Sequence, residues 1–319
     1  MSGSRPPSPS KQVINQFGDK IHDDLKQYDK YGSGDEVPFI KEFVQLMDQQ
    51  FAYDGNQLIF CKGKMAHSSP FITYPGISKY KKGSIELADL LVYIRYIEQD
   101  SVVGRRAFFS QTKCVKKSKT GRGIWHLDKS QAEFMKEKPP FILNYQGATR
   151  CHDISESNES FLNYSFVSDI HRPFLYNPKD LSDFTKDLSS YNKFVYGKHP
   201  VVGRRLLYSK LKMLLSKKYG SETNKKSNEY HLIEDVFELG NLDYSSSTNV
   251  ATDGGDSSDS AFGVVQIDVS FDQSYLNFDH PLFQELSPDK IFSDEIDQEI
   301  FKIIEEELSK LENGGVCIY

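Results

Sequence analysis

Residues 36–147 are predicted to form a β-sheet with helices, a fold of the α/β or α+β class, because helical and strand-like patterns alternate along them. Three observations lead to this prediction. Apolar residues recur at helical spacing over residues 38–51, after an acidic start typical of a helix N-terminus. Two apolar stretches, residues 85–97 and 105–115, have a short connection and are expected to pair as an antiparallel hairpin. A second helix is predicted over residues 127–136, where two prolines end it.

Shorter patterns predict further elements on both sides of this hairpin. Strands are expected at residues 58–61, 71–74, 141–145, 161–167 and 262–271. Helices are expected near residues 13–25, 178–189, 201–219 and 294–311.

Three parts of the chain are distinguished by composition. Residues 1–35, which begin with a Pro/Ser-rich tail, are expected to be a flexible N-terminal segment. Residues 36–150 should form the core, and residues 151–319 a C-terminal extension packed on it. The stretch near 244–260 is rich in Ser, Gly and Asp and is predicted to be a mobile loop.

The net charge of −6 conceals an uneven distribution. From Ile267 onward there are 13 acidic and 3 basic residues, a balance of −10, so the rest of the chain carries +4. A mildly basic body is compatible with a polyanionic partner, and equally with ordinary solvated helix faces.

Several classes of protein and compartment are disfavoured by what the sequence lacks. The four cysteines form no C-x-x-C pair, so we expect no structural zinc site and a reducing, cytoplasmic environment. No apolar N-terminal leader or membrane-length apolar stretch occurs, so we expect no membrane association. The histidines lack zinc-hydrolase spacing, and neither a G-x-S-x-G elbow nor a P-loop is found.

Three polar residues interrupt the two apolar stretches of the predicted hairpin. Gln111 and Lys113 lie two positions apart on one strand, so their side chains point to the same face. Asp89 lies within the neighbouring stretch, where a charged group needs a partner or a metal. Asp89 and Lys113 could form a structural ion pair. Alternatively, Asp89 and the Gln111 carbonyl oxygen could hold Mg²⁺ or Mn²⁺, with Lys113 stabilising charge on a phosphate.

Two further carboxylates are candidate ligands. Glu86 precedes Asp89 by three residues, so in an unbroken strand the two side chains would face opposite sides. A bulge, or a strand that begins after Glu86, would bring them together. Glu42 on the helix over residues 38–51 could lend a carboxylate, or lie on a solvated helix face.

The pattern Glu86-Leu-Ala-Asp89 with an apolar run, followed by an apolar run with Gln111-Thr-Lys113, resembles the PD-(D/E)xK nuclease superfamily in its Q-x-K form. The resemblance is closest to bacterial restriction-endonuclease-like proteins and covers roughly residues 36–147.

Features outside the two motifs are also similar to that superfamily. His67 and Pro70 lie in a loop before the motifs, and Gln131 lies on a helix followed by a strand that begins Pro140-Phe141.

The resemblance implies an α/β fold in which a central mixed β-sheet is flanked by helices, with a C-terminal elaboration. It implies Mg²⁺-dependent cleavage of DNA, with Mn²⁺ as a substitute. Asp89 matches the metal-binding aspartate, Gln111 the (D/E) position, Lys113 the catalytic lysine and Glu86 a preceding acidic residue. The chain departs from the common pattern in the neutral amide of Gln111, and in Ala88 where a proline is usual.

A basic loop begins just beyond Lys113. Its charged residues, expected to contact flanking phosphates or to form a solvated turn, are Lys116, Lys117, Lys119 and Arg122.

Two functions of different classes follow from these observations. The first is a metal-dependent endonuclease that acts on DNA in a defence system against foreign DNA. The sequence does not distinguish this enzyme from one that acts on RNA. The enzyme could act as a homodimer or with a partner protein of that system. The second is a nuclease-like fold without catalysis that serves as a nucleic-acid-binding or assembly module.

Overall fold

The structure is a computed structural model of the 319-residue chain. It describes residues 7–27, 36–48, 50–66, 68–80, 82–99, 101–114, 116–117, 123–125, 128–145, 147–168, 171–176, 194–195, 205–240 and 262–271.

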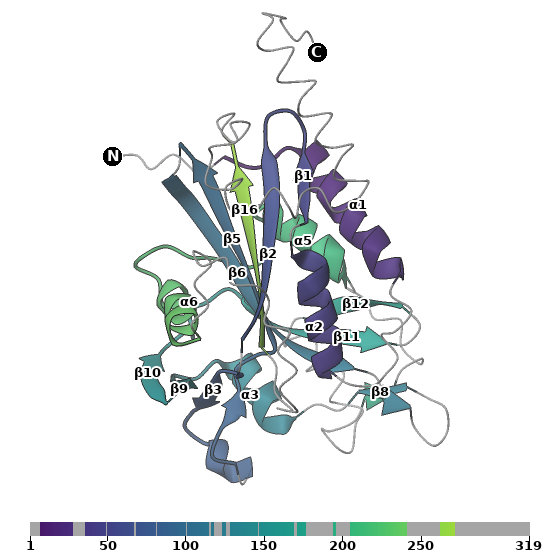
Figure 1. Cartoon of the computed structure of the whole chain (residues 1–319). Helices are drawn as coiled ribbons and strands as arrows, with labels where there is room; N and C mark the ends of the chain where they lie inside the picture. The colour runs from purple at the N-terminus through teal and green to yellow at the C-terminus, as the bar shows by residue number, and fades with distance from the viewer. Residues whose placement is uncertain are drawn as a thin grey trace, which may run out of the picture.

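A nine-stranded mixed sheet forms the centre of the molecule (Figure 1). From one edge to the other its strands are β1 (Phe51–Tyr53), β2 (Leu58–Ala66), β16 (Phe262–Ser270), β5 (Leu90–Glu98), β6 (Ser101–Cys114), β11 (Leu162–Ser168), β12 (His171–Tyr176) and β14 (Arg205–Leu206). The short strand β15 (Ser221–Glu222) also pairs with β6. The β16–β5 and β11–β6 pairs are parallel and the other pairs antiparallel, so the sheet is mixed.

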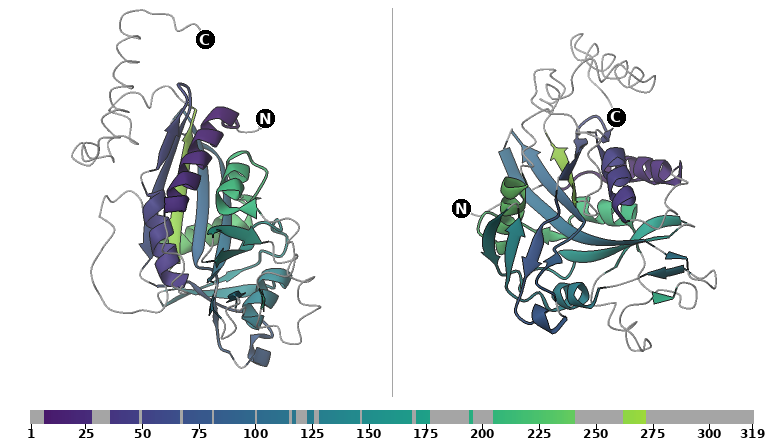
Figure 2. Two further views of the ribbon diagram at one scale, coloured as in Figure 1. Left: turned by 90° about the vertical axis from the view of Figure 1, so that its right-hand side faces the viewer. Right: turned by 60° about the horizontal axis from the view of Figure 1, so that its bottom comes forward.

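Helices cover both faces of this sheet (Figures 1 and 2). One face carries α1 (Lys11–Gln27), α2 (Glu36–Met47) and α5 (Leu207–Leu215). The other carries α6 (Asn228–Leu239), α3 (Lys129–Glu137) and a second sheet. This arrangement confirms the predicted α/β class, with a central mixed sheet flanked by helices.

Two smaller sheets complete the fold. The four-stranded sheet has the order β10 (Ala148–His152), β9 (Phe141–Tyr145), β3 (Phe71–Thr73) and β4 (Ile85–Glu86), and a short 3-10 helix, η2 (Ile77–Tyr80), follows β3. The three-stranded sheet consists of β13 (Phe194–Val195), β8 (Gly123–Trp125) and β7 (Lys116–Lys117).

Strand β5 separates two cores because its alternate side chains enter opposite faces. Leu91 and Tyr93 belong to the core beneath α6, α3 and the four-stranded sheet. Val92 and Ile94 belong to the core beneath α1, α2 and α5. Every residue of β16 is buried, as expected for a strand covered on both faces.

Two glycines let α2 approach the sheet closely. A Cβ on Gly63 of β2 would lie 2.2 Å from the backbone oxygen of Val44, and one on Gly263 of β16 would lie 2.6 Å from a Val44 methyl group. Side chains at these positions would therefore push α2 away from the sheet.

The predicted hairpin is confirmed: β5 and β6 pair antiparallel, and Leu90 lies opposite Ser110. The prediction of one continuous strand over residues 85–97 is wrong. Residues 87–89 leave strand geometry and separate β4 from β5. β4 pairs with β3 instead, so the apolar run serves two different sheets. Hydrophobicity alone could not show this break.

Other expectations need correction. Residues 1–35 include α1, whose Val13 and Phe17 are fully buried, because this helix has an apolar stripe that packs in the core. The C-terminal part supplies β16, a central strand rather than a packed-on extension. The helix expected over residues 201–219 is limited to α5. The expected helices at 178–189 and 294–311 and the loop at 244–260 lie outside the described residues.

Candidate functional site

Asp89 lies immediately before β5, at the end of the sheet nearest α3. Its backbone N–H donates to the Ser110 oxygen of β6 at 3.0 Å, and its carbonyl accepts from Gly263 of β16 at 2.8 Å. Neighbouring strands on both sides therefore fix the backbone from which the carboxylate projects. The side chain is 6% exposed.

The Asp89 carboxylate accepts hydrogen bonds from two neutral donors of β6. Its Oδ2 atom accepts from Gln111 Nε2 at 2.6 Å and from the Thr112 backbone N–H at 2.5 Å. Gln111 is almost fully buried. The alternation of β6 places Gln111 on the Asp89 side and turns the next side chain away, so only the backbone of Thr112 contributes.

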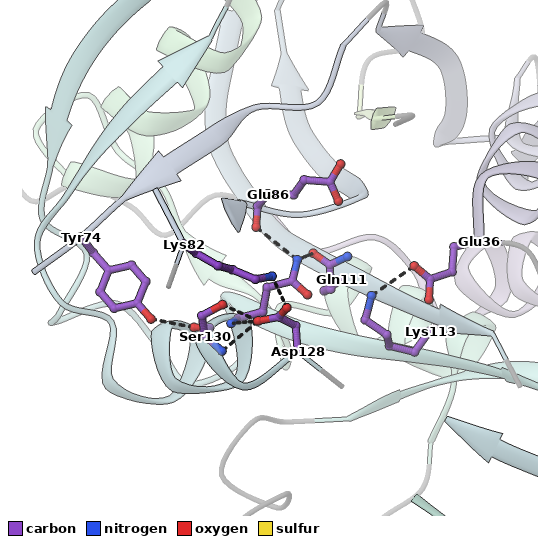
Figure 3. A network of polar contacts seen from close by, with 9 residues as sticks. Glu36, Tyr74, Lys82, Glu86, Gln111, Lys113, Asp128 and Ser130 are labelled. Atoms are coloured by element: carbon purple, nitrogen blue, oxygen red, sulfur yellow. Dashed lines mark hydrogen bonds and ion pairs between the residues drawn. The ribbon is translucent and has the colours of Figure 1, made fainter. Parts of the chain in front are cut away.

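Lys113 brings a positive charge to the same end of the sheet. Its Nζ donates to Glu36 Oε2 of α2 at 3.1 Å, and its side chain is 8% exposed against 33% for Glu36 (Figure 3). Desolvating an ammonium is costly unless a carboxylate compensates, and Glu36 supplies that compensation.

The charges of the cluster shift one another's protonation. Burial raises the pKa of Asp89 to about 7; Lys113 opposes this shift, and Glu36 and Glu86 add to it. Burial alone would lower the pKa of Lys113, but Asp89, Glu36 and Glu86 outweigh it, so the pKa is raised and the ammonium stays charged. A buried acid that titrates near neutrality beside a charged lysine is an arrangement common at functional sites.

Glu86 approaches the cluster from the four-stranded sheet. Because β4 ends at Glu86 and β5 begins at Leu90, the opposite-face objection for one continuous strand does not apply. Burial raises the pKa of Glu86, while the charge of Lys113 lowers it. Figure 3 shows Gln111 between Glu86 and Lys113.

Gln131 of α3 holds the amide of Gln111. Its Nε2 donates to Gln111 Oε1 at 3.0 Å and approaches the Glu86 backbone oxygen at 3.5 Å. The N-terminus of α3 is fixed by Asp128, whose side chain accepts from the Ser130 and Gln131 backbone N–H groups. The Gln111 oxygen therefore faces Gln131, and its NH₂ faces Asp89.

Two members of this cluster were not assigned roles from the sequence. Glu36, not the candidate metal ligand Glu42, is the α2 carboxylate that contacts Lys113. The two residues are six positions apart on α2, about 120° around the helix, so only one can face Lys113. Gln131 resembled a family feature, but its contact with Gln111 depends on where α3 packs, which spacing does not show.

The remaining site predictions are placed only in part. Lys116 and Lys117 form β7, while Lys119, Arg122 and His67 lie outside the described residues. Nothing in the described part of the chain brings Glu42 to the Asp89 cluster.

The carboxylate oxygens of this cluster could hold a divalent cation such as Mg²⁺ through few protein ligands. In the described residues no group of three or more His, Cys, Asp or Glu side chains could hold a metal ion by itself. Mg²⁺ commonly takes one or two protein carboxylates and fills its shell with water and substrate phosphate. Asp89, buried and hydrogen-bonded by neutral donors, and Glu86 are the carboxylates suited to this role. Gln111 could add its carbonyl oxygen as a ligand only if the side-chain amides of Gln111 and Gln131 both flipped, so that oxygen and NH₂ exchange places.

Comparison of the chain with protein-family models, with curated proteins and with solved structures found no match. Of the helices that the structure describes, none has the length and apolar character needed to span a membrane.

Proposed function

We propose that this protein hydrolyses phosphodiester bonds of DNA in a reaction that depends on Mg²⁺ or Mn²⁺. The observation that carries the proposal is that a buried acid, Asp89, and a buried and charged Lys113 lie at the same end of the sheet without bonding to each other. A structural ion pair would be expected to join these two groups directly. Instead, Lys113 donates to Glu36, and Asp89 accepts from Gln111 and Thr112.

The side chains of the cluster would divide cation binding and phosphate stabilisation between them. Asp89 and Glu86 would hold the cation, which when bound supplies Lewis acidity and a more acidic water. Lys113 would place its charge beside the phosphate and stabilise the charge that develops there. Glu36 orients that ammonium. Gln131 fixes the amide of Gln111.

The DNA on either side of the cleaved bond would contact the basic segment beyond Lys113, which comprises Lys116, Lys117, Lys119 and Arg122. Activity in the cytoplasm against foreign DNA, as a homodimer or with a partner protein, is part of the same proposal.

A second function, nucleic-acid binding without catalysis, is favoured by one observation. The Gln111 amide presents its NH₂ to Asp89, so the oxygen that would complete a metal site is turned away. In this alternative, Lys113 and the basic segment bind phosphate and the cation is not needed.

Cleavage of plasmid and linear DNA tests the two functions against each other. Wild type, Asp89→Ala, Lys113→Ala and Glu42→Ala would each be incubated with EDTA, Mg²⁺ or Mn²⁺, after circular dichroism confirms their folding. The proposal expects metal-dependent cutting by wild type and Glu42→Ala only. Retained cutting by folded Lys113→Ala would overturn it. DNA binding in EDTA without cutting in any metal would favour the binding module.

A further inference from the structure

The four-stranded sheet has an outer face that begins at the candidate site. Phe71 of β3 lies opposite Glu86 of β4 on one side and Asn144 of β9 on the other. Side chains opposite each other in a sheet share a face, so Phe71 and Glu86 lie on neighbouring strands about 4.8 Å apart. The site carboxylate and the aromatic ring are therefore adjacent on one surface.

Two large apolar side chains are exposed on this outer face, among polar neighbours. Phe71 is 37% exposed and Ile142 is 42% exposed, and the only other exposed large hydrophobic side chain among the described residues is Val103 of β6. Ile142 lies opposite Thr73 on β3, two positions from Phe71, or about 7 Å along the strand. Because these two side chains lie on one small sheet beside the candidate site, a ligand held at that site could cover both of them.

A hollow of about 800 Å³ lies at the end of this sheet and is lined from both of its faces. Thr73 and Ile142 come from the outer face, Phe141 and His152 from the inner face, and Asn228 and Asp235 from α6. His152 lies with its Nε2 3.1 Å from Asp235 Oδ2, and burial lowers the pKa of this histidine while Asp235 opposes that shift. The carboxylates of Asp153 and Asp235 can accept hydrogen bonds from the N–H groups of a base, and their charge disfavours a phosphate.

We propose that the outer face of the four-stranded sheet binds an unpaired stretch of the nucleic acid, with one base stacked on Phe71 and the next in the hollow. The protein's substrate would then be a single strand, or a duplex with a single-stranded segment beside the cleaved bond. Bases within a duplex are stacked on their neighbours, so a side chain can stack only on an unpaired base. This inference rests on the proposed function, because it takes Glu86 as a cation ligand at the cleavage site.

The test measures binding in EDTA, where no cleavage occurs. Fluorescence anisotropy would give the affinities of a labelled single strand and of a blunt duplex of equal length. Phe71→Ala should weaken single-strand binding by roughly 5- to 100-fold and leave duplex binding unchanged. Phe71→Trp should restore it. In a Trp125→Phe background, the new tryptophan's fluorescence should be quenched by the single strand but not by the duplex.

A matched pair controls for surface charge. Ile142→Glu should weaken single-strand binding, whereas Val103→Glu, a similarly exposed apolar position on β6, should not. Equal single-strand affinity of wild type and Phe71→Ala, or equal effects of the two glutamates, would overturn the inference.

Cleavage by wild type in Mg²⁺ is measured separately. Cutting with no effect of Phe71→Ala would overturn the inference alone and leave the hydrolase standing. Single-strand binding lost in Phe71→Ala, without cutting by wild type in any metal, would support the binding face and overturn the hydrolase.

Discussion

Nε2 of Gln111 lies 2.6 Å from Oδ2 of Asp89 and donates a hydrogen bond to it. A carboxylate at position 111 would repel the Asp89 carboxylate, whereas the Gln111 amide donates a hydrogen bond to it. This contact stabilises the ionised form of Asp89, while burial favours the protonated form and raises its pKa to about 7. Near pH 7 the Asp89 carboxyl is therefore divided between its protonated and ionised forms.

Replacing Asp89 by Asn should separate stability from activity. The folded pKa of Asp89, about 7, lies above its ordinary value of 3.8. Its contribution to stability is thus complete below about pH 4 and is lost as pH rises through 7. Asp89→Asn should abolish cleavage, yet at pH 8 should unfold with a free energy higher by about 2–4 kcal/mol. Urea unfolding at pH 4 and pH 8 measures this, and an equal difference at both pH values would contradict it.

Replacing Glu36 by Gln should shift the pH dependence of activity. Glu36 raises the pKa of Asp89, so its neutralisation should lower that pKa and move the rising, acidic limb of the rate profile to lower pH. Glu42→Gln, on another side of α2, is the matched control and should leave the profile in place. Identical profiles for Glu36→Gln and wild type would remove Glu36 from the cluster.

Replacing Gln111 by Glu should lower the stability of the metal-free protein and raise its affinity for Mn²⁺. The new carboxylate would face Asp89 and lose its hydrogen bond, so the metal-free protein should be about 1–3 kcal/mol less stable at pH 8. A third carboxylate beside Asp89 and Glu86 should also tighten Mn²⁺ binding by on the order of tenfold. Thermal unfolding with and without Mn²⁺ tests both effects, and an unchanged stabilisation by the metal would argue against a ligand role for this position.

Adding a methyl group at Gly63 should disturb both fold and site. The new Cβ would meet the Val44 backbone oxygen at 2.2 Å, so Gly63→Ala should cost about 1–3 kcal/mol and displace α2. Because α2 carries Glu36, the Lys113 contact should weaken as well. Gly83→Ala is the control, since nothing lies within 4 Å of its added Cβ. Equal urea midpoints for the two variants would contradict the close packing of α2.

The sequence allowed the hairpin and the proximity of Asp89, Gln111 and Lys113 to be predicted, because both depend on local pairing of two stretches. Asp89, Gln111 and Lys113 needed only two adjacent strands in register. The position of β16 could not be predicted, because its pairing with β5 joins segments more than 160 residues apart. Glu36 rather than Glu42 contacts Lys113 because of the rotation of α2 about its axis where it packs on Gly63 and Gly263. The helical pattern of the sequence does not predict this rotation.

Mn²⁺ binding by the isolated protein tests the central claim most directly, because it requires no knowledge of the substrate. Calorimetric titration at pH 8 would compare wild type with Asp89→Asn and Glu42→Gln. We expect one Mn²⁺ site in wild type and in Glu42→Gln, and none in Asp89→Asn. At pH 7, binding should also release protons, because the cation displaces the proton of Asp89. Equal Mn²⁺ binding by wild type and Asp89→Asn would contradict the assignment of Asp89 as the metal ligand.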